Sequence, residues 1–426
     1  MAAHVGSQRI AADYDVLILG GGCAGLACYE ALRAQDLRCA IVESKAFLGG
    51  RVRGFAGAEH HDAGAAWVHG ASPANPQLAL AAAAGVAVSE TFPANPWRAR
   101  PRPSPRATRR RGFAGGDDHG GAAGAAAFVA RAHGTMMELW MGASARELQL
   151  REFEAQADED ALCGDFPAPR PAAGGMRGVL APLVAAVPDS AKLLGRRCVA
   201  VRTGAAGVRV ETLGGDAYAC QRCVVALPLG VLGSLPDLRP APAGGEARAI
   251  ARLGVGAYAK VLLRFERRWW RDGDGDVAPV PRARGRRRPS SSASTTARTT
   301  ARSRRPSRAT RRARATPRAT AAASRACSRR SSGPRAAPPP VVAAHTTDWT
   351  NDPDARGAYS FWPAGAGDAD VDDLAAPVDG RLFFAGEATS VEYQGSMAGA
   401  LLSGARAAAE VLDAARGGRA PEHLRI

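Results

Sequence analysis

The stretch DVLILGGGCAGLACYEALRAQDLRCAIVESKAFLGGR, residues 15–51, decides the fold. An apolar run over 16–19 has the length of a buried parallel strand and ends in a glycine-rich turn. Gly20, Gly22 and Gly25 fit the pattern G-x-G-x-x-G. In that pattern the first glycine permits a tight turn, the second lets main-chain N–H groups approach a pyrophosphate, and the third lets a helix pack closely.

The residues after these glycines continue the same unit. The pattern predicts a helix over 23–34, whose positive N-terminus faces the phosphate, and a second strand over 39–42. Glu43 ends that strand, where a carboxylate accepts hydrogen bonds from a ribose diol and repels a 2′-phosphate. The stretch therefore predicts a dinucleotide site; a glycine-rich turn without a ligand is the alternative, because the chain holds 49 glycines.

Length and composition limit the class of protein. A chain of 426 residues can hold two domains. The sequence has no run of 18 apolar residues, so we expect no membrane span. About 13 residues precede the first strand, so we expect no signal or transit peptide. The eight cysteines are scattered, which indicates a reducing compartment, and the lone C-x-x-C at 220–223 lacks partners for zinc, so no metal is expected.

The formal net charge of +16 comes from two segments. Residues 96–112 hold seven arginines and residues 278–340 hold eighteen, and neither segment has an acidic residue. The remainder of the chain is therefore acidic. Both segments lack hydrophobic periodicity, and the second is rich in Arg, Ser, Thr, Ala and Pro, so we expect it to be disordered or the product of a gene-model error. A basic tether for nucleic acid is the alternative, but the segment has no aromatic residue on which bases could stack.

Several motifs together resemble the flavin-containing amine oxidase family, which includes polyamine oxidases, monoamine oxidases and histone lysine demethylases. The turn Gly49-Gly50-Arg51 follows Glu43 as it does in that family. The other resembling blocks occur in the family's order: HDAGAAWVHG at 61–70, GGM at 174–176, VVALPLGVL at 224–232, LGVGAYAKVLLRFERRWW at 253–270, WTNDPDARGAYS at 349–360 and LFFAGEATSVEYQGSMAGALLSGARAAAEVL at 382–412.

The resemblance implies an α/β fold, α+β overall, with a Rossmann-like FAD-binding domain and a discontinuous substrate domain that carries a mixed sheet and helices. The expected FAD-binding parts are 13–92, 171–240 and, after one substrate strand, the later part of 341–415. The expected substrate-domain parts are 93–170, with low complexity at 96–127, and 241–277, followed by the segment 278–340.

The resemblance also implies the site residues. FAD is expected without a covalent bond, because the block 382–412 has no cysteine. The residues expected to contact it are Gly20, Gly22, Ala24, Gly25, Glu43, Gly50, Arg51, Gly64, Ala65, Ala66, Trp67, Val199, Trp349, Gly386, Glu387, Gly395, Ser396 and Met397. The helix after Gly395 would direct its N-terminus at the pyrimidine edge of the flavin, where negative charge grows on reduction.

Three residues match catalytic positions of the family. Lys260 corresponds to a lysine joined to flavin N5 through water, and burial there would lower its pKa. Tyr359 corresponds to one wall of an aromatic cage around the substrate nitrogen. His69 favours the polyamine oxidase branch. Two departures stand out, since Ala259 replaces the family's asparagine and Ser396 leaves the second cage wall small.

The expected activity is FAD-dependent oxidation of an amine, best a polyamine, by hydride transfer to flavin N5. O₂ would be reduced to H₂O₂ and the imine would hydrolyse. The alternatives are a catalytically impaired flavoprotein, or a defective gene model, with an intact FAD site, and, less favoured, a basic nucleic-acid-binding scaffold. We expect a cytoplasmic location, with the peroxisome as the alternative, and the sequence leaves the exact amine and the oligomeric state open.

Overall fold

The fold is built on one large sheet. The computed structural model describes residues 13–55, 58–69, 73–88, 138, 141–144, 147–148, 174–204, 206–235, 237–239, 245–267, 296–299 and 339–417. The order of the paired strands is β5 (Lys192–Leu193), β2 (Cys39–Val42), β1 (Tyr14–Leu19), β8 (Ala217–Val225), β7 (Gly207–Thr212), β6 (Cys198–Gly204) and β9 (Asp237–Arg239). A further strand, β15 (Leu382–Phe384), runs parallel to the second half of β8.

The first half of this sheet is parallel and the second half is largely antiparallel. β1 pairs in parallel with β2 on one side and with β8 on the other, and β2 pairs in parallel with β5. β7 is antiparallel to both β8 and β6. This arrangement, with a helix crossing over between β1 and β2, confirms the Rossmann-like α/β fold expected from the glycine-rich stretch.

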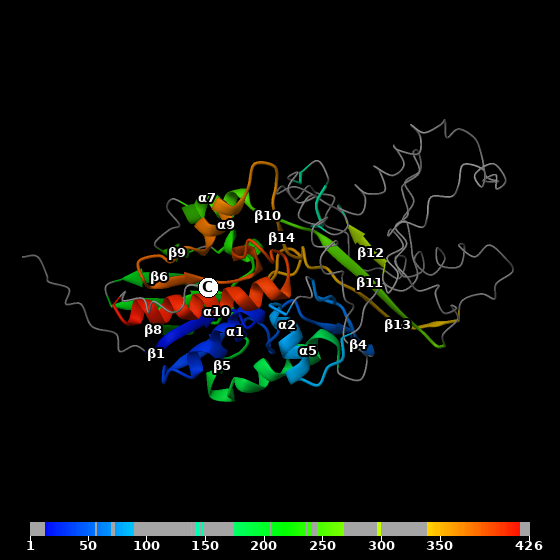
Figure 1. Ribbon diagram of the computed structural model, residues 1–426, viewed down its shortest axis with the longest axis horizontal. Helices are drawn as coiled ribbons and strands as arrows, with labels where there is room; N and C mark the ends of the chain where they lie inside the picture. Colours follow the sequence, from blue (N-terminus) through cyan, green and yellow to red (C-terminus); the bar gives the residue numbers. More distant parts are fainter. Residues whose placement is uncertain are drawn as a thin grey trace, which may run out of the picture.

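Two layers of helices cover the two faces of the sheet (Figure 1). One layer consists of α1 (Cys23–Arg33), α2 (Pro76–Ala83), α5 (Gly175–Ala186) and α10 (Met397–Ala415), and the other includes α6 (Leu229–Leu232), α7 (Gly245–Arg252) and α9 (Asp368–Ala375). Successive side chains of β1 point to opposite faces of the sheet, so the strand contributes to the core under each helix layer. Val16 and Ile18 join the first core, whereas Leu17 and Leu19 join the second.

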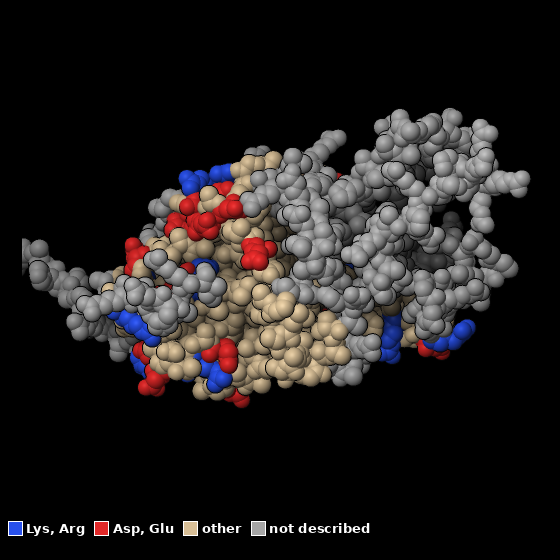
Figure 2. Space-filling model, in the orientation of Figure 1, with Lys and Arg blue, Asp and Glu red and all other residues tan. Residues whose placement is uncertain are grey.

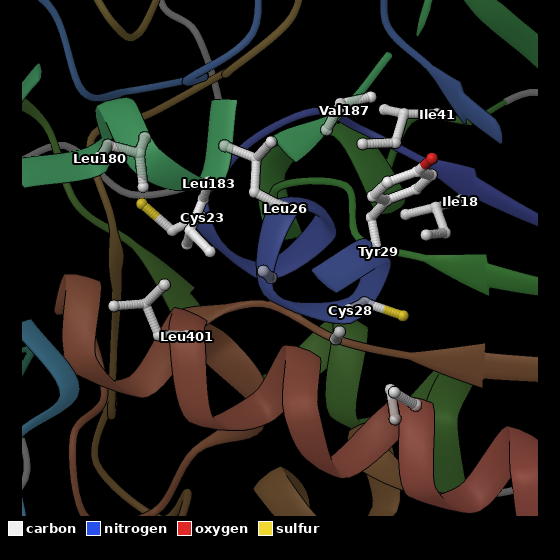
Figure 3. Packing of buried hydrophobic residues seen from close by; sticks show 14 of the residues in the cluster. Ile18, Cys23, Leu26, Cys28, Tyr29, Ile41, Leu180, Leu183, Val187 and Leu401 are labelled. Atoms are coloured by element: carbon white, nitrogen blue, oxygen red, sulfur yellow. The ribbon is translucent and has the colours of Figure 1, made fainter. Parts of the chain in front are cut away.

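The helix α1 lies at the centre of the first core (Figure 3). Leu26, Cys28 and Tyr29 of α1 pack among side chains of the sheet, of α5 and of α10, Leu401 among them. On the α10 side the two helices approach so closely that a Cβ at Gly404 would stand 2.2 Å from the main-chain oxygen of Ala24. The contact joins the first helix of the chain to the last described one.

Three smaller sheets lie beside the large one. β3 (Gly54–Phe55) pairs with β4 (Ala58–Asp62), and β10 (Gly254–Val255) pairs with β14 (Ser360–Phe361). β11 (Tyr258–Phe265) stands between β12 (Thr296–Thr299) and β13 (Val341–Thr346) in an antiparallel sheet. Short 3₁₀ turns occur at η2 (Asp189–Ala191) and η4 (Glu387–Thr389). Lys260 is the third residue of β11, and Figure 1 shows this strand beside β12 and β13.

The sequence-based boundaries hold within a residue or two for β1, α1 and β2. Two expectations are wrong. The apolar pattern at 222–232 predicts a strand over that whole stretch, but the strand ends at Val225, and Leu229–Leu232 is the short helix α6, for which Pro228 is the N-cap. The C-terminal helix is expected from Gly395, but it begins at Met397, since Ser396 serves as its N-cap.

Most of the two arginine-rich segments lies outside the described residues. So does most of 147–160, a stretch that resembles a helical piece of the family's substrate domain. The strand β12 falls within 278–340, and its main chain pairs with β11. The expectation for the rest of that segment stays a prediction, as do the domain boundaries.

Six described cysteines are free thiols, and burial raises the pKa of most of them, including Cys23 to about 12. Figure 2 shows acidic side chains gathered near α7 and α9, where Arg252 pairs with Asp370 at 3.3 Å. In the parts of the chain that the structure describes, no helix combines the length and apolarity required to cross a bilayer.

Candidate active site

The turn that begins α1 is open toward a ligand. Gly20 has φ +101°, and a Cβ there would stand 2.7 Å from the oxygen of Ala226, so the turn requires glycine. Gly22 is the N-cap of α1, and no side chain caps the first turn or places an acid in it. A Cβ on Gly22 would meet only the Cα of Gly50, at 4.0 Å. The N–H groups at this helix start are therefore available to an anion such as a diphosphate.

The second glycine turn lies directly against the first. Gly49 N donates to Gly21 O at 2.7 Å, and Gly50 adopts φ +56° with its Cα facing Gly22. Glu43 is 6% exposed and braces the same turn, since its carboxylate accepts hydrogen bonds from Gly21 N at 2.7 Å and from Lys45 N at 2.8 Å. The structure thus brings Glu43, Gly22 and Gly50 together, and their contact with FAD stays a prediction.

Arg51 joins the N-terminal glycine turns to the C-terminal part of the chain. Its Nη1 donates to Glu387 Oε1 at 3.0 Å and to the main-chain oxygen of Ala358 at 2.7 Å. Glu387 is 5% exposed and also accepts from Ser360 Oγ at 2.5 Å and from Gly395 N at 3.1 Å. One buried carboxylate therefore fixes four main-chain segments around a common point.

The C-terminal block supplies the start of α10 beside this carboxylate. Gly386 has φ +140° and its N–H donates to Ser403 Oγ at 2.9 Å. Ser396 accepts a hydrogen bond from Gly399 N at 3.1 Å, as an N-cap does. Met397 follows as the first residue of α10 and is buried. The expected second cage wall at Ser396 is thus a hydroxyl used to cap the helix.

Lys260 is held in a buried position by main-chain oxygens. Its Nζ donates to Gly64 O at 2.5 Å and to Asp62 O at 3.4 Å, and lies 4.9 Å from the ring centroid of Trp67. The side chain is 3% exposed, and burial lowers the pKa of Lys260 to about 8, against the charge of Asp62, which raises it. The Lys260 side chain therefore points into the protein and not to solvent.

Residues 62–64, whose main-chain oxygens accept from Lys260, pack closely against the Gly-Gly-Arg turn. A Cβ at Gly64 would stand 1.7 Å from Arg51 O, so only glycine fits there. Ala65 N donates to the same oxygen at 3.3 Å, and Ala66 is buried. The block 61–70 therefore lies directly on the Gly-Gly-Arg turn, and the structure joins the two stretches that the sequence analysis assigned separately to FAD.

Tyr258, Tyr359 and Trp349 form an aromatic wall beside the start of β11. The rings of Tyr359 and Tyr258 are 6.1 Å apart at 42°, and Trp349 packs beside them with Ala355 and Ala358. Burial raises the pKa of Tyr258 to about 12 and that of Tyr359 well above its usual value, so both phenols stay neutral. The Arg53 guanidinium lies 5.7 Å from the ring centroid of Trp349.

Tyr258 is a residue that the sequence analysis missed. Strand alternation contained the signal, because Tyr258 lies two residues before Lys260 and therefore shares its face of β11. Asp62 and Ser360 were also missed as contributors, although both lie within the quoted motif blocks. Their side chains act on main-chain N–H groups or on Glu387, and such contacts are not visible as a sequence pattern.

For three expected site residues the structure gives only the burial or a single main-chain contact. The main-chain oxygen of His69 accepts from Nδ2 of Asn75, the N-cap of α2, at 2.6 Å. Val199 is half-buried on β6, and Ala24 is buried in the first turn of α1. The roles expected for His69 and Val199 stay predictions.

The residues present fit a dinucleotide cofactor. The uncapped start of α1 and the free space at Gly22 form a cradle, and Glu43 lies at its rim. Close to Gly395, the Nε2 atom of Gln394 is buried without a hydrogen-bond partner, so a polar donor faces the interior there. In the described residues no cluster of His, Cys, Asp or Glu has the arrangement of a metal site.

Comparisons with known proteins agree with this geometry. A family model described as flavin containing amine oxidoreductase matches residues 94–412, and a model of an NAD(P)-binding Rossmann-like domain matches residues 18–83. The first match covers well over half of the chain. The protein belongs to the flavin containing amine oxidoreductase family, and its cofactor is FAD.

Individual relatives are more distant. Polyamine oxidase 4 of Oryza sativa subsp. japonica is 28% identical over 279 residues, which are 64% of this chain and 54% of that protein. Lysine-specific histone demethylase 1 homolog 1 of Arabidopsis thaliana is 33% identical over 227 residues, 51% of this chain and 26% of the relative. The chain thus spans about half the length of the polyamine oxidase that it matches, and less of the demethylase.

Among solved structures, wild-type putrescine oxidase bound to putrescine matches with a TM-score of 0.65 at 20% identity. The match covers 94% of this chain and 99% of that one. The likeness confirms the fold.

Proposed function

We propose that this chain oxidises amines with FAD, and that its substrates are polyamines. The observation that carries the proposal is the geometry of β11. One face of that strand presents Lys260, buried under Trp67, and Tyr258, which packs against Tyr359. A titratable amine and a pair of aromatic rings are therefore fixed on a single rigid strand close to the glycine-rich cofactor cradle.

FAD, when bound, supplies the acceptor for a hydride from the carbon next to the substrate nitrogen, and O₂ then takes up the electrons to give H₂O₂. The chain's own residues bind and orient. Arg51 and Glu387 link the N-terminal glycine turn to the C-terminal block, and both would help to hold FAD. Tyr258 and Tyr359 offer neutral ring faces that exclude water and attract a cationic amine.

Lys260 can exchange a proton within the physiological range. Its pKa near 8 leaves a substantial neutral fraction at pH 7.5, whereas an exposed lysine would be almost wholly protonated. Its Nζ already donates to two carbonyl oxygens, so a neutral Lys260 keeps a lone pair available for a proton from a nearby water. We infer that Lys260 accepts and donates protons during imine hydrolysis or flavin reoxidation.

The polyamine assignment draws on named relatives and on charge. Polyamine oxidases of Oryza sativa and Zea mays are among the curated proteins that resemble the chain, and putrescine oxidase resembles it in fold. The formal charge outside the two arginine-rich segments is negative, which favours approach of polycations to the folded body.

The test is anaerobic reduction of the bound flavin. Purified holoprotein would be mixed with putrescine, spermidine or spermine, with benzylamine and a dimethyl-lysine histone H3 peptide as comparison substrates. We expect the yellow flavin band to bleach with at least one polyamine and H₂O₂ to form when air is admitted. Bleaching only by the peptide would assign demethylase activity instead. Tight FAD binding with no bleaching by any amine would establish the impaired flavoprotein.

A further inference from the structure

The carboxylate of Asp62 lies at the start of α5. Both of its oxygens accept a hydrogen bond from Met176 N, at 3.0 and 3.1 Å. The helix approaches so closely that a Cβ on Gly175, which has φ +64°, would stand 2.7 Å from Asp62 Oδ1. The side chain is 5% exposed, so a buried carboxyl group lies at the positive end of a helix of 12 residues, which favours its ionised form.

The main chain of the same residue receives Lys260. Asp62 O and Gly64 O are the two oxygens to which Lys260 Nζ donates. Strand β4, which ends at Asp62, is therefore pinned on one side by α5 through a carboxylate and on the other side by β11 through an ammonium.

We propose that Asp62 is a positioning residue for Lys260: its carboxylate anchors the start of α5, its carbonyl holds the ammonium, and its negative charge sets how readily Lys260 keeps a proton. The catalytic importance of this link rests on the proposed function, whereas the link itself belongs to the folded chain and is measurable without turnover.

Among the described residues, the charged groups that act on Asp62 are Lys260 from β11 and Arg177 from α5, and the charge that acts on Lys260 is that of Asp62. Burial raises the pKa of Asp62 to about 7, while the Met176 N–H and the Lys260 charge oppose that rise. The two groups therefore titrate in adjoining ranges, and each ionisation favours the other.

The sequence makes the charge of Lys260 directly observable. Lysine occurs only at positions 45, 192 and 260, so holoprotein grown with [¹³Cε]lysine gives three signals. The variants Lys45→Arg and Lys192→Arg assign them. Titration from pH 6 to 10 then reports the ionisation midpoint of Lys260 alone, whether or not any amine reduces the flavin.

The decisive variant is Asp62→Asn. An amide oxygen can still accept from Met176 N, but the negative charge is gone, so we expect the Lys260 midpoint to fall by about one pH unit. The signals of Lys45 and Lys192 should coincide with those of the wild type. The exposed Asp379→Asn is the matched control and should leave all three signals in place. An unchanged Lys260 midpoint in Asp62→Asn would overturn the proposal.

A second variant separates the anchor from the charge. Asp62→Ala removes both, so hydrogen exchange at the start of α5 should be faster than in Asp62→Asn. Equal protection in the two variants would contradict the anchoring role. If neither variant folds, the wild-type titration still decides, since the Lys260 signal should show a second inflection near pH 7 from Asp62. A single-step curve would reject the charge link.

Discussion

Arg51 Nη1 lies 3.0 Å from Glu387 Oε1, although 336 residues separate the two in the sequence. The bond connects the Gly-Gly-Arg turn to η4 in the interior of the site. Ser360 and Gly395 donate to the same carboxylate, so Glu387 is the point at which the second glycine turn, the aromatic wall and the approach to α10 meet.

Glu387→Gln should therefore weaken FAD binding. The amide cannot accept from all of the donors that face the carboxylate, and its NH₂ group would confront one of them. Hydrogen bonds to charged groups contribute about 1.5–3 kcal/mol each, so we expect the Kd for FAD to rise about 10- to 100-fold. Fluorescence titration of apoprotein with FAD measures the change. The exposed Asp379→Asn serves as the control, and an unchanged Kd for Glu387→Gln would contradict the organising role of this carboxylate.

The stability of the protein should depend on pH through Lys260. Its pKa falls from 10.5 in the unfolded chain to about 8 in the folded chain, so between these values the unfolded chain binds more protons. The free energy of unfolding contributed by Lys260 therefore rises with pH from about 8 to about 10.5, by on the order of 3 kcal/mol.

Urea denaturation of the wild type and of Lys260→Met at pH 7.5 and at pH 10.5 isolates this contribution. The wild type should gain stability relative to the variant as the pH is raised. Leu262→Met, on the same buried face of β11, is the control and should leave the pH dependence as in the wild type. A constant difference between wild type and Lys260→Met would show that Lys260 is not held in a desolvated place.

Tyr359→Leu should weaken substrate binding more than it slows chemistry, because the ring faces attract a cationic amine. Cation–π contacts contribute about 0.5–2 kcal/mol, so we expect the KM for a polyamine to rise about 2- to 30-fold with the flavin spectrum retained. Tyr359→Phe keeps the ring and should behave almost as the wild type. Tyr218→Leu disrupts a comparable tyrosine pair, 6.4 Å from Tyr14, and should leave KM unaltered. Equal KM values for all three variants would refute the aromatic wall.

Gly404→Ala should destabilise the contact between α1 and α10. A methyl group there would stand 2.2 Å from Ala24 O, and overpacking of this kind costs about 1–3 kcal/mol even after the better helix propensity of alanine is counted. Thermal unfolding of the holoprotein gives the difference. Leu402→Ala, at an exposed position of the same helix, should shift the midpoint much less, and a greater loss for Leu402→Ala would contradict this packing argument.

The parts of the fold predicted from sequence are those in which local pattern and tertiary environment agree. The run at 16–19 is apolar on both faces because both faces of β1 are covered, and the glycines at 20, 22 and 25 are spaced for a turn that the main chain requires. The strand predicted over 222–232 is wrong at Leu229–Leu232. The apolar residues there suit a strand, but Pro228 and packing against the second face of the large sheet make them a helical turn.

The candidate site was predicted as two sets of residues, one for FAD and one for catalysis, without the contacts between them. Motif spacing identifies Lys260 and Glu387, but the oxygens that hold Lys260 are main-chain atoms of 62–64, which any residue type supplies. Likewise, the pairing of Tyr258 with Tyr359 depends on how two distant segments cross. Such relationships arise only when the chain has folded.

The packing of C-terminal elements on the N-terminal glycine turns has a consequence for biosynthesis. β15 pairs in parallel with β8, and α10 covers α1, yet both are synthesised long after the glycine-rich turns. The glycine-rich turns are synthesised first. The face of α1 that packs against α10 therefore stays uncovered until residues 382–415 have been synthesised. Cofactor capture must therefore wait until residues 382–415 have been synthesised, and a nascent chain halted before β15 would expose the apolar side of α1 to chaperones.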